Sequence, residues 1–395
     1  MHLLMLGAWP ELAERLVGLP ARVTLIQPPG VATAREAAWA HRYVELDYHD
    51  HDKAMEIAER IHQADPVDAV VSFRELALPA LAAVAARLGV RSISGPVETL
   101  PRNKNAVRKL LNAGGCRVVK HRVCESADDL AAFAAECGHS VVVKPSVAYV
   151  MGGAHGVAGP EDVAPAWRHV TAATEEEILA EERLIGPEFS VEVRSVDGEH
   201  EVVMVTGKQH TGMPYFIEVG HVVPAAIGAD DHAAIVRETV LALTAAGHET
   251  GPSHVEVILT EDGPAIVEIN RRLAGDRIWE LIQLATGRDL MTEVLLDAAG
   301  APHSPTHRPA GGAAIAYLVA DAERRVADEL PVDAANSVDG LIRVKVTAQP
   351  SSIARTPDAP HSRLGYVMTV AETGEAAAEA AERAKELVLQ QLFAH

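Results

Sequence analysis

The sequence has few basic residues for its number of acidic ones. Only 35 Lys and Arg residues stand against 55 Asp and Glu residues, so the formal net charge is −20. A chain this acidic does not condense on the phosphate backbone of nucleic acids. Nor is it attracted to anionic membrane surfaces. We therefore expect neither a nucleic-acid partner nor membrane association.

Cysteines and long apolar runs are also scarce. The three cysteines, Cys116, Cys124 and Cys137, are odd in number and form no CxxC pair, which predicts reduced thiols in a cytoplasmic protein. No apolar run approaches the length that spans a bilayer. The segment Met1–Leu6 is apolar but short, and it lacks a basic start and a cleavage site. It is predicted to be a buried strand rather than a targeting signal.

Residues 1–98 alternate apolar strands with amphipathic helices. We expect strands at His2–Leu6, Ala21–Gln27 and Asp68–Ser72, and helices at Glu11–Leu16, Ala32–His41 and Lys53–Ala64. This alternation predicts a parallel sheet covered on both faces. A lone Gly7 follows the first strand, so the GxGxxG fingerprint of a dinucleotide site is missing. An NAD-dependent reductase is therefore poorly supported.

The rest of the chain mixes short strands and helices. Helices are expected at Asn103–Ala113, with Asn103 as the N-cap, and at Asp128–Cys137, Asp231–Ala246, Arg277–Leu296 and Gly374–Phe393. The proline-rich segment Ala301–Pro309 cannot hold regular structure and marks a boundary.

The strongest chemical pattern lies in His254–Asn270, which reads as two strands joined by residues 261–263. A three-residue loop that ends in glycine is a common hairpin connection, and it would place Glu256 opposite Glu268. Because strand side chains alternate, Glu268 and Asn270 share a face. Facing carboxylates repel each other unless a cation lies between them, and oxygen ligands suit Mg²⁺. The pattern predicts a magnesium site, with a solvated acidic face as the alternative.

Three further segments have residues suited to phosphates or nucleotides. Arg271 and Arg272 follow the acidic hairpin, where an arginine can clamp a transferring phosphoryl group. Lys144 ends an apolar strand and precedes a glycine-rich loop, which lets backbone N–H groups approach phosphates. Glu188 follows a Gly-Pro connection between two strands, where it could accept hydrogen bonds from ribose hydroxyls. The alternatives are a surface basic pair, an ordinary hairpin and a charged edge strand.

In this order, these segments resemble the ATP-grasp superfamily from about Asn103 to about Asp297. The resemblance implies an α/β (α+β) ATP-grasp fold with three parts. They would be a Rossmann-like parallel-sheet domain at 1–98, an ATP-grasp core at 99–302 and a C-terminal α+β domain at 303–395 that completes the large domain. A lid subdomain at about 116–183 would cover the nucleotide.

The resemblance also implies roles for individual residues. The ATP-binding residues would be Lys104, Lys144, Ser146, Gly152, Gly153, Gly156, Glu181, Glu182, Leu184, Glu188 and Lys208. Mg²⁺, for which Mn²⁺ can substitute, would be held by Glu256, Glu268 and Asn270. Arg272 and Lys144 would be catalytic, with Arg272 stabilising an acyl phosphate and the tetrahedral intermediate that follows.

Within the superfamily the chain most resembles the L-amino-acid ligases, which are dipeptide synthetases. Residues 215–224 resemble their glycine-histidine-proline segment, and residues 271–276 their loop after the metal-binding asparagine. The resemblance implies ATP- and Mg²⁺-dependent ligation of a carboxylate to an amine, with release of ADP and phosphate. The substrates would be small molecules, amino acids or other carboxylates, contacted by Glu75, Glu218, His221, Arg271 and Gly275. The chain departs from the family at Arg271, where proline is usual, and in its bulky loop at residues 149–155.

Two other functions fit part of the pattern. A carboxylase or purine-type ligase that acts through carboxyphosphate would share every ATP-binding residue. A non-catalytic, nucleotide-binding regulatory protein would have little use for a complete metal set. The sequence does not reveal which amino acids are joined, or whether the bond is an α-peptide or a side-chain amide. A homodimer is the default expectation for the oligomeric state.

Overall fold

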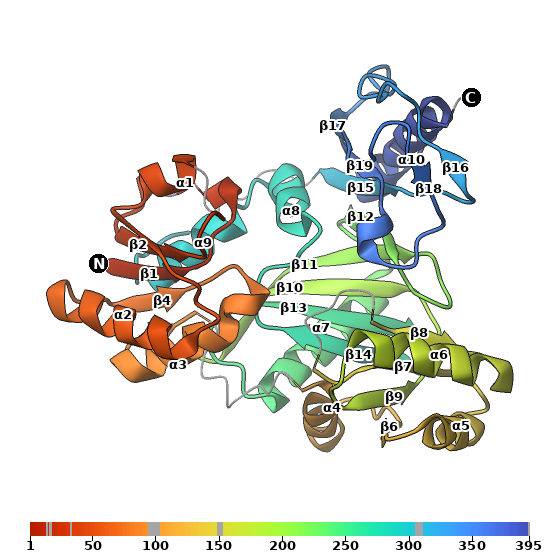
Figure 1. Ribbon diagram of the computed structural model, residues 1–395, viewed down its shortest axis with the longest axis horizontal. Helices are drawn as coiled ribbons and strands as arrows, with labels where there is room; N and C mark the ends of the chain where they lie inside the picture. The colour runs from red at the N-terminus through yellow and green to blue at the C-terminus, as the bar shows by residue number, and fades with distance from the viewer. Residues whose placement is uncertain are drawn as a thin grey trace.

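The computed structural model describes residues 1–12, 15, 18–31, 34–93, 103–147, 153–304 and 311–393. Within them the chain forms a five-stranded, a four-stranded and an eight-stranded sheet, with a small two-stranded one. The five-stranded sheet and the C-terminal strands lie at opposite ends of the molecule, and most of the eight-stranded sheet lies between them (Figure 1). The predicted α/β (α+β) class is confirmed.

The N-terminal sheet is parallel, with strand order β3-β2-β1-β4-β5. Its strands are β1 (His2–Leu6), β2 (Arg22–Gln27), β3 (Arg42–Glu45), β4 (Ala69–Val71) and β5 (Arg91–Ser92). The helical elements of this unit are α1 (Ala34–Trp39), α2 (His51–Ala64), α3 (Leu78–Leu88) and the 3-10 turns η1 (Pro10–Leu12) and η2 (Glu75–Ala77). β1 is buried along its whole length, as expected of a strand covered on both faces.

The four-stranded sheet is antiparallel, with strand order β6-β9-β7-β8. It consists of β6 (His121–Cys124), β7 (Val141–Pro145), β8 (His155–Val157) and β9 (Ile178–Glu182). Helices α5 (Ala127–Glu136) and α6 (Pro160–Ala173) pack against it and against each other. The buried apolar residues of this sheet and its two helices, among them Leu130, Phe133 and Val141, form a separate core.

The eight-stranded sheet runs in the order β14-β13-β10-β11-β12-β15-β19-β17 and is antiparallel throughout. Its strands are β10 (Glu188–Val196), β11 (Glu199–His210), β12 (Glu218–Val223), β13 (Gly251–Thr260), β14 (Gly263–Asn270), β15 (Gly312–Leu318), β17 (Leu341–Val346) and β19 (Gly365–Ala371). The remaining C-terminal elements are β16 (Arg324–Arg325), β18 (Ile353–Ala354) and η4 (Pro360–Ser362). The C-terminal strands therefore continue the same sheet that contains the acidic hairpin.

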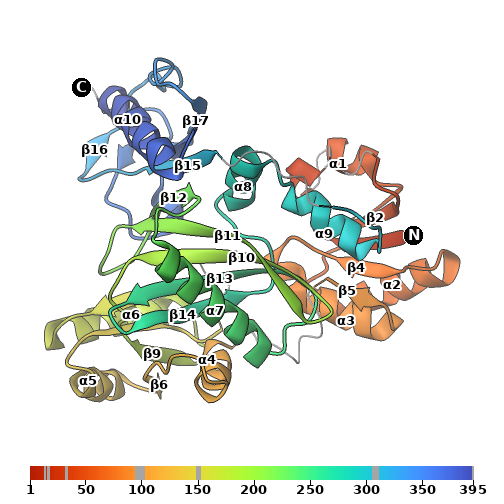
Figure 2. The same ribbon diagram turned by 180° about the vertical axis from the view of Figure 1, so that it is seen from behind.

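Several helices of the described residues border the large sheet, and three of them lie along the parts that matter for the site and the C-terminal strands. They are α4 (Lys104–Ala113), α7 (Ala229–Ala245) and α10 (Gly374–Leu392). α7 packs on β13 and β14, and α10 packs on β15 and β19 (Figure 2). Asn103 caps α4 as predicted, because its side-chain oxygen accepts a hydrogen bond of 2.9 Å from the N–H of Ala106.

One predicted helix differs from the structure, and another is only partly described. Of the helix expected at Glu11–Leu16, residues 11 and 12 lie in the short 3-10 turn η1, whose hydrogen bond joins Leu12 to Trp9, and residues 13, 14 and 16 lie outside the described part of the chain. The single helix expected at Arg277–Leu296 is wrong, because it is broken into α8 (Ile278–Thr286) and α9 (Leu290–Ala298). Gly287 ends α8 with a left-handed φ of 78°, and Asp289 caps α9.

Helix α9 turns back to pack on the N-terminal sheet. Its residues Leu290, Met291 and Leu295 share one apolar core with β1 and β2. Arg15 joins the same contact by placing its Nε 2.7 Å from the carboxylate of Asp289. Both views show α9 beside β1 and β2 (Figures 1 and 2).

The cysteines and the length of the apolar helices were both singled out by composition. Cys116, Cys124 and Cys137 are all free. Burial raises the pKa of Cys116 and of Cys124 to about 11, which makes these thiols poor nucleophiles. Among the helices of the described residues, none is long and apolar enough to cross a membrane.

Candidate active site

The β13–β14 hairpin carries the acidic residues that stand out in the sequence. Its turn contains two residues rather than the predicted three, because Thr260 pairs directly with Gly263. Gly263 closes the turn with a φ of 108°, a conformation open to glycine. A β-bulge between Glu256 and Val257 then shifts the ladder, and Glu256 pairs with Glu268 as predicted. Without the bulge, Glu268 would lie on the other face.

Each of these two carboxylates faces a lysine. Nζ of Lys208 lies 2.7 Å from Oε1 of Glu256, and Nζ of Lys104 lies 3.1 Å from Oε1 of Glu268. Asn270 is two residues further along β14. The residues predicted to bind metal thus lie together near one edge of the large sheet, and ammonium groups balance the charge of the facing carboxylates.

Lys208 connects three strands through ion pairs. Its buried Nζ lies 2.7 Å from Glu188 on β10, 2.6 Å from Glu218 on β12 and 2.7 Å from Glu256 on β13. Burial alone would lower the pKa of Lys208, but the three carboxylates raise it well above its usual value. Burial would raise the pKa of Glu256, but Lys208 and His254 lower it well below its usual value. Lys208 and Glu256 are therefore both charged at neutral pH.

Two further buried residues, His254 and Glu192, extend the network around Glu256. Nδ1 of His254 lies 2.7 Å from Glu192, and its Nε2 lies 3.4 Å from Glu256. Burial would lower the pKa of His254, but Glu192 and Glu256 raise it to about 9. His254 is therefore an imidazolium at neutral pH. Glu192 carries no sequence motif, and only the pairing of β10 with β13 places it opposite His254.

A second buried network lies where the four-stranded sheet meets α4. Nζ of Lys144, near the end of β7, lies 2.6 Å from Oε2 of Glu181 on β9. Arg108 on α4 donates from Nε to the other carboxylate oxygen at 2.5 Å. Burial would raise the pKa of Glu181, but Lys144 and Arg108 lower it to about 2. The sequence motifs do not mark Arg108, whose one local signal is its place one helical turn after Lys104.

Arg272 links the loop after β14 to the N-terminal sheet. Its Nε donates to the carboxylate of Glu75 in η2, so two residues predicted separately for the site meet. Arg271 beside it is buried. A Cβ added at Gly275 would meet no atom within 4 Å, so packing does not require glycine there.

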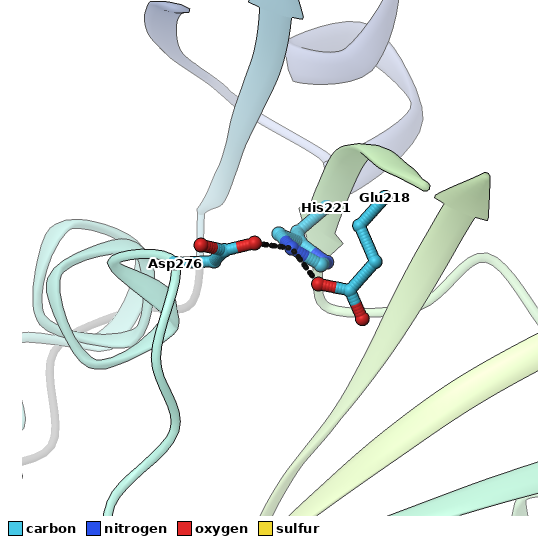
Figure 3. A group of neighbouring side chains, drawn as sticks. All are labelled: Glu218, His221 and Asp276. Carbon is cyan, nitrogen blue, oxygen red and sulfur yellow. Dashed lines mark hydrogen bonds and ion pairs between the residues drawn. The ribbon is translucent and has the colours of Figure 1, made fainter. Parts of the chain in front are cut away.

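Glu218, His221 and Asp276 form a cluster beyond Lys208. Nε2 of His221 lies 3.4 Å from Oδ2 of Asp276 and 3.6 Å from Oε2 of Glu218, with the imidazole between the two carboxylates (Figure 3). The structure thus brings together Glu218 and His221, both predicted to contact substrate. Asp276 is an addition that no spacing in the sequence indicates.

The C-terminal part of the chain holds Asp276 in place. Arg363 donates two hydrogen bonds, of 2.6 and 2.9 Å, to its carboxylate. The Arg363 guanidinium lies 3.9 Å above the ring of Tyr317, whose hydroxyl donates to the Asp276 carbonyl. Burial would raise the pKa of Asp276, but His221 and Arg363 lower it well below its usual value.

Among the described residues, two groups of acidic and histidine side chains lie close enough together to hold a cation. They are Glu188, Glu218 and Glu256, and Glu218, His221 and Asp276. In each group a basic side chain of the protein already supplies positive charge: Lys208 in the first and Arg363 in the second. Neither geometry alone therefore assigns a metal.

Comparison with known proteins places this site in a family. The ATP-grasp domain family matches residues 137–280, and the ATP-grasp N-terminal domain family matches residues 12–90. The chain belongs to the ATP-grasp superfamily. The L-amino acid ligase C-terminal domain 2 family matches residues 316–390, so the C-terminal part of this ATP-grasp protein is of the L-amino acid ligase type.

Individual relatives agree with this assignment. The alanine–anticapsin ligase of Bacillus amyloliquefaciens is 27% identical over 287 residues, which cover 66% of this chain and 59% of the relative. The chain spans about 60% of the length of the first curated relatives that it matches.

Solved structures share the ATP-grasp fold over almost the whole chain. The L-amino acid ligase of Bacillus licheniformis is 23% identical with a TM-score of 0.78, covering 98% of this chain and 97% of that one. An N5-carboxyaminoimidazole synthetase of Staphylococcus aureus complexed with ADP is 14% identical with a TM-score of 0.73, covering 97% of this chain and 96% of that one. Likeness at these identities shows the fold.

The predicted phosphate loop of the ATP-grasp site is only partly described. Gly152 lies outside the described residues, and Gly153 is buried. Gly156 lies inside β8 and not in a loop, which corrects that prediction. Its N–H donates to the Pro214 carbonyl, and a Cβ there would clash with Met213. Packing therefore explains this glycine.

In the segment Glu181–Leu184, which the family resemblance predicts to bind adenine, two backbone N–H groups already donate hydrogen bonds within the protein. The N–H of Glu182 donates to the Lys120 carbonyl, and the N–H of Arg183 donates to the Ser140 carbonyl. Within the described part of the chain, the N–H of Leu184 has no such partner. Leu184 is therefore the backbone donor of this segment that stays open to an adenine edge.

Ser146 has a local structural contact. Its hydroxyl donates to Glu177 at 2.8 Å, and its carbonyl accepts from the N–H of Lys104. Ser146 thus ties the end of β7 to the start of α4. Whether it also binds ATP stays a prediction.

Glu181 should make the folded state sensitive to acid. Although burial opposes the shift, Lys144 and Arg108 lower the pKa of Glu181 from 4.5 to about 2. Its contribution of about 3 kcal/mol is present above pH 4.5 and is lost as the pH falls toward 2. We expect Glu181→Gln to lose that stability at neutral pH and to show a flatter decline in acid. Urea unfolding across this pH range measures both; parallel pH profiles would contradict the prediction.

Proposed function

We propose that this ATP-grasp protein is an ATP- and Mg²⁺-dependent ligase that forms an amide or peptide bond between amino acids. The observation that carries the proposal is the in-register pair of Glu256 and Glu268 with Lys208 and Lys104 beside it. Phosphoryl transfer depends on positioning and on electrostatic stabilisation, and this arrangement supplies both. The L-amino acid ligase type of the C-terminal part supports amino acids as substrates.

The donor set fits Mg²⁺. Two carboxylates face each other on neighbouring strands, and an amide follows two residues later, so all donors are oxygens. We propose that Glu256, Glu268 and Asn270 hold the ion, and that Mn²⁺ can substitute because the same oxygen ligands suit it. When bound, the ion would neutralise negative charge on the phosphates.

The nucleotide would lie between the four-stranded lid sheet and the large sheet. Lys104 and Lys144 would contact the phosphates, and the backbone at Leu184 would contact adenine. Glu188 would bind the ribose hydroxyls, with one of its carboxylate oxygens held by Lys208. The separate apolar core of the lid sheet supports its motion as a unit. These assignments extend the proposal to a domain division at 1–98, 99–302 and 303–395, with the lid at about 116–183.

The substrates would be bound on the other side of Lys208. Glu218 can accept hydrogen bonds from a substrate ammonium group, and His221, whose Nε2 lies 3.6 Å from Glu218, would be its neighbour in that substrate site. Arg272 would stabilise the negative charge of the acyl phosphate and then that of the tetrahedral intermediate. Closure of the lid would keep water from the acyl phosphate, leaving the amine as the nucleophile. The products would be the amide, ADP and phosphate.

A panel assay tests the proposal directly. Purified protein with ATP and Mg²⁺ is given amino acids singly and in pairs, and ADP, phosphate and product masses are measured. We expect one pair to elicit ADP release and a product whose mass equals the two amino acids less water. The same reaction without Mg²⁺ is the control, and it should be silent.

Two other results would redirect the assignment. ADP release that requires bicarbonate would support the carboxyphosphate chemistry of a carboxylase or purine-type ligase. ATP binding with no release for any amino acid would support a regulatory, nucleotide-binding role. The predicted homodimer is checked separately by the mass of the protein in solution.

A further inference from the structure

Arg108 is a buried arginine that touches both halves of the proposed ATP site. It lies on α4 with 2% of its surface exposed. Its Nε donates to Glu181 on β9, and one of its terminal nitrogens donates to the carbonyls of Ile266 and Val267 on β14, at 2.7 and 3.3 Å. A planar guanidinium with five donors suits such divided binding, whereas a lysine ammonium does not.

The two carbonyls that Arg108 binds belong to the β-bulge of the hairpin. Val257 pairs with Ile266 and Glu256 pairs with Glu268, so Val267 is the extra residue of β14. This extra residue turns Glu268 to the same face as Glu256. Arg108 therefore holds the backbone at the point where the orientation of a metal-binding carboxylate is decided.

The neighbouring turn of α4 reaches the same stretch of β14. Lys104, four residues before Arg108, lies 3.1 Å from the carboxylate of Glu268. Residues four apart share one face of a helix, so a single face of α4 contacts both the bulge and the carboxylate that the bulge presents.

The other contact of Arg108 lies in the lid sheet. Glu181 shares its carboxylate between Arg108 and Lys144, and it is the first residue of the segment Glu181–Leu184 that is predicted to bind adenine. Arg108 thus connects the strand that leads to the adenine segment with the bulge that orients Glu268. No other described residue donates hydrogen bonds to both places.

We infer that Arg108 is a positioning residue that sets the metal-binding carboxylate of Glu268 on β14 relative to the nucleotide-binding strand of the lid sheet. It would contact neither ATP nor metal itself. The inference rests on the proposed function, because it assigns metal binding to Glu256 and Glu268. Loss of a residue that orients a metal ligand typically weakens metal affinity by about 10- to 100-fold.

The test is a calorimetric titration of Mn²⁺ into the protein–ADP complex. Arg108→Lys keeps the positive charge but loses the forked donor geometry of the guanidinium. We expect this variant to weaken Mn²⁺ binding by about 10- to 100-fold. Arg288→Lys is the matched control, because Arg288 is equally buried and binds Glu293 and Glu201 through the same kind of fork. It should lower the melting temperature without changing Mn²⁺ affinity.

A second readout needs no ligand. Hydrogen exchange in the peptide covering residues 263–270 should be faster in Arg108→Lys than in the wild type, and unchanged in Arg288→Lys. If Arg108→Lys does not fold, Arg108→Met combined with Glu181→Gln removes the guanidinium together with the charge that it neutralises. That double variant should show the same loss of Mn²⁺ affinity.

The possible outcomes distinguish a failure of this inference from a failure of the proposed function. Wild-type protein that binds Mn²⁺ and ADP, beside an Arg108→Lys variant with unchanged affinity and exchange, would overturn the inference alone. Wild-type protein that binds neither ligand would overturn the proposed function, and the inference with it. Weaker Mn²⁺ binding in Arg108→Lys but not in Arg288→Lys supports both.

Discussion

Replacing Lys208 with methionine is expected to destabilise the fold by about 3–5 kcal/mol and to abolish ATP turnover. Methionine has a similar volume, but it leaves Glu188, Glu218 and Glu256 facing one another without the cation that lies within 2.7 Å of each. Removing one partner of a buried charge network leaves its other charges uncompensated. Urea unfolding at neutral pH measures the loss of stability, and ADP release measures turnover.

The loss of stability should depend on pH. Although burial opposes both shifts, the carboxylates raise the pKa of Lys208 above 10.5, and Lys208 lowers the pKa of Glu256 below 4.5. The contribution of Lys208 is present below pH 10.5 and is lost as the pH rises through its folded pKa. That of Glu256 is present above pH 4.5 and is lost as the pH falls. The contributions of Lys208 and Glu256 should therefore both be present between these limits.

In Lys208→Met the dependence of stability on pH should reverse between neutral pH and pH 4.5. Glu256 loses the cation that keeps it ionised, so protonation relieves repulsion and the deficit should shrink as the pH falls toward 4.5. Lys53→Met is the control, because the Lys53–Asp50 pair is exposed to solvent and should contribute little to stability. A Lys208→Met protein with wild-type stability at every pH would show that the network does not act as described.

Replacing Glu268 with alanine is expected to lower ATP turnover by about 100- to 1,000-fold while the protein stays folded. The variant would lose one of the two facing carboxylates proposed to hold Mg²⁺. Folding should survive because β14 is an edge strand and the Glu268 side chain is 29% exposed. Its partner Lys104 is 19% exposed and can turn to solvent on its flexible stem. The measurement is ADP release against Mg²⁺ concentration, with circular dichroism to verify folding.

The same hairpin offers a matched control for this prediction. Glu261 lies exposed in the two-residue turn, so Glu261→Ala removes an equal charge from the same hairpin without touching the site. It should keep wild-type turnover and Mg²⁺ dependence. Turnover in Glu268→Ala equal to that in Glu261→Ala would refute the metal assignment of β14.

Local patterns were sufficient for several elements. Asn103 caps α4 because its side chain reaches an N–H three residues away, an interaction contained in one short segment. The alternation of apolar residues along β13 and β14 places Glu268 and Asn270 on one face by the geometry of a strand. The glycine-rich loop and the Gly-Pro connection indicated nucleotide binding through their resemblance to a family, not through any distance that the sequence contains.

The acidic hairpin shows how a correct pairing can follow from an incorrect turn. A three-residue loop and a regular ladder place Glu256 opposite Glu268, and so do a two-residue turn and a β-bulge at Val267. Alternation of side chains does not distinguish these two arrangements. The bulge carbonyls are bound by Arg108, which lies on α4 and outside the hairpin. The hairpin sequence alone does not contain this contact.

The sequence by itself determined the class of fold and the superfamily, and it predicted which residues would bind ATP and metal. Each of these depends on side-chain period, on capping or on motifs within one segment. Only the tertiary structure decided how the charges are balanced. Glu181 lies 73 residues from Arg108, and Asp276 lies 87 residues from Arg363. Such partners meet because sheet pairing and helix packing bring distant segments together, and burial then makes each charge depend on the other.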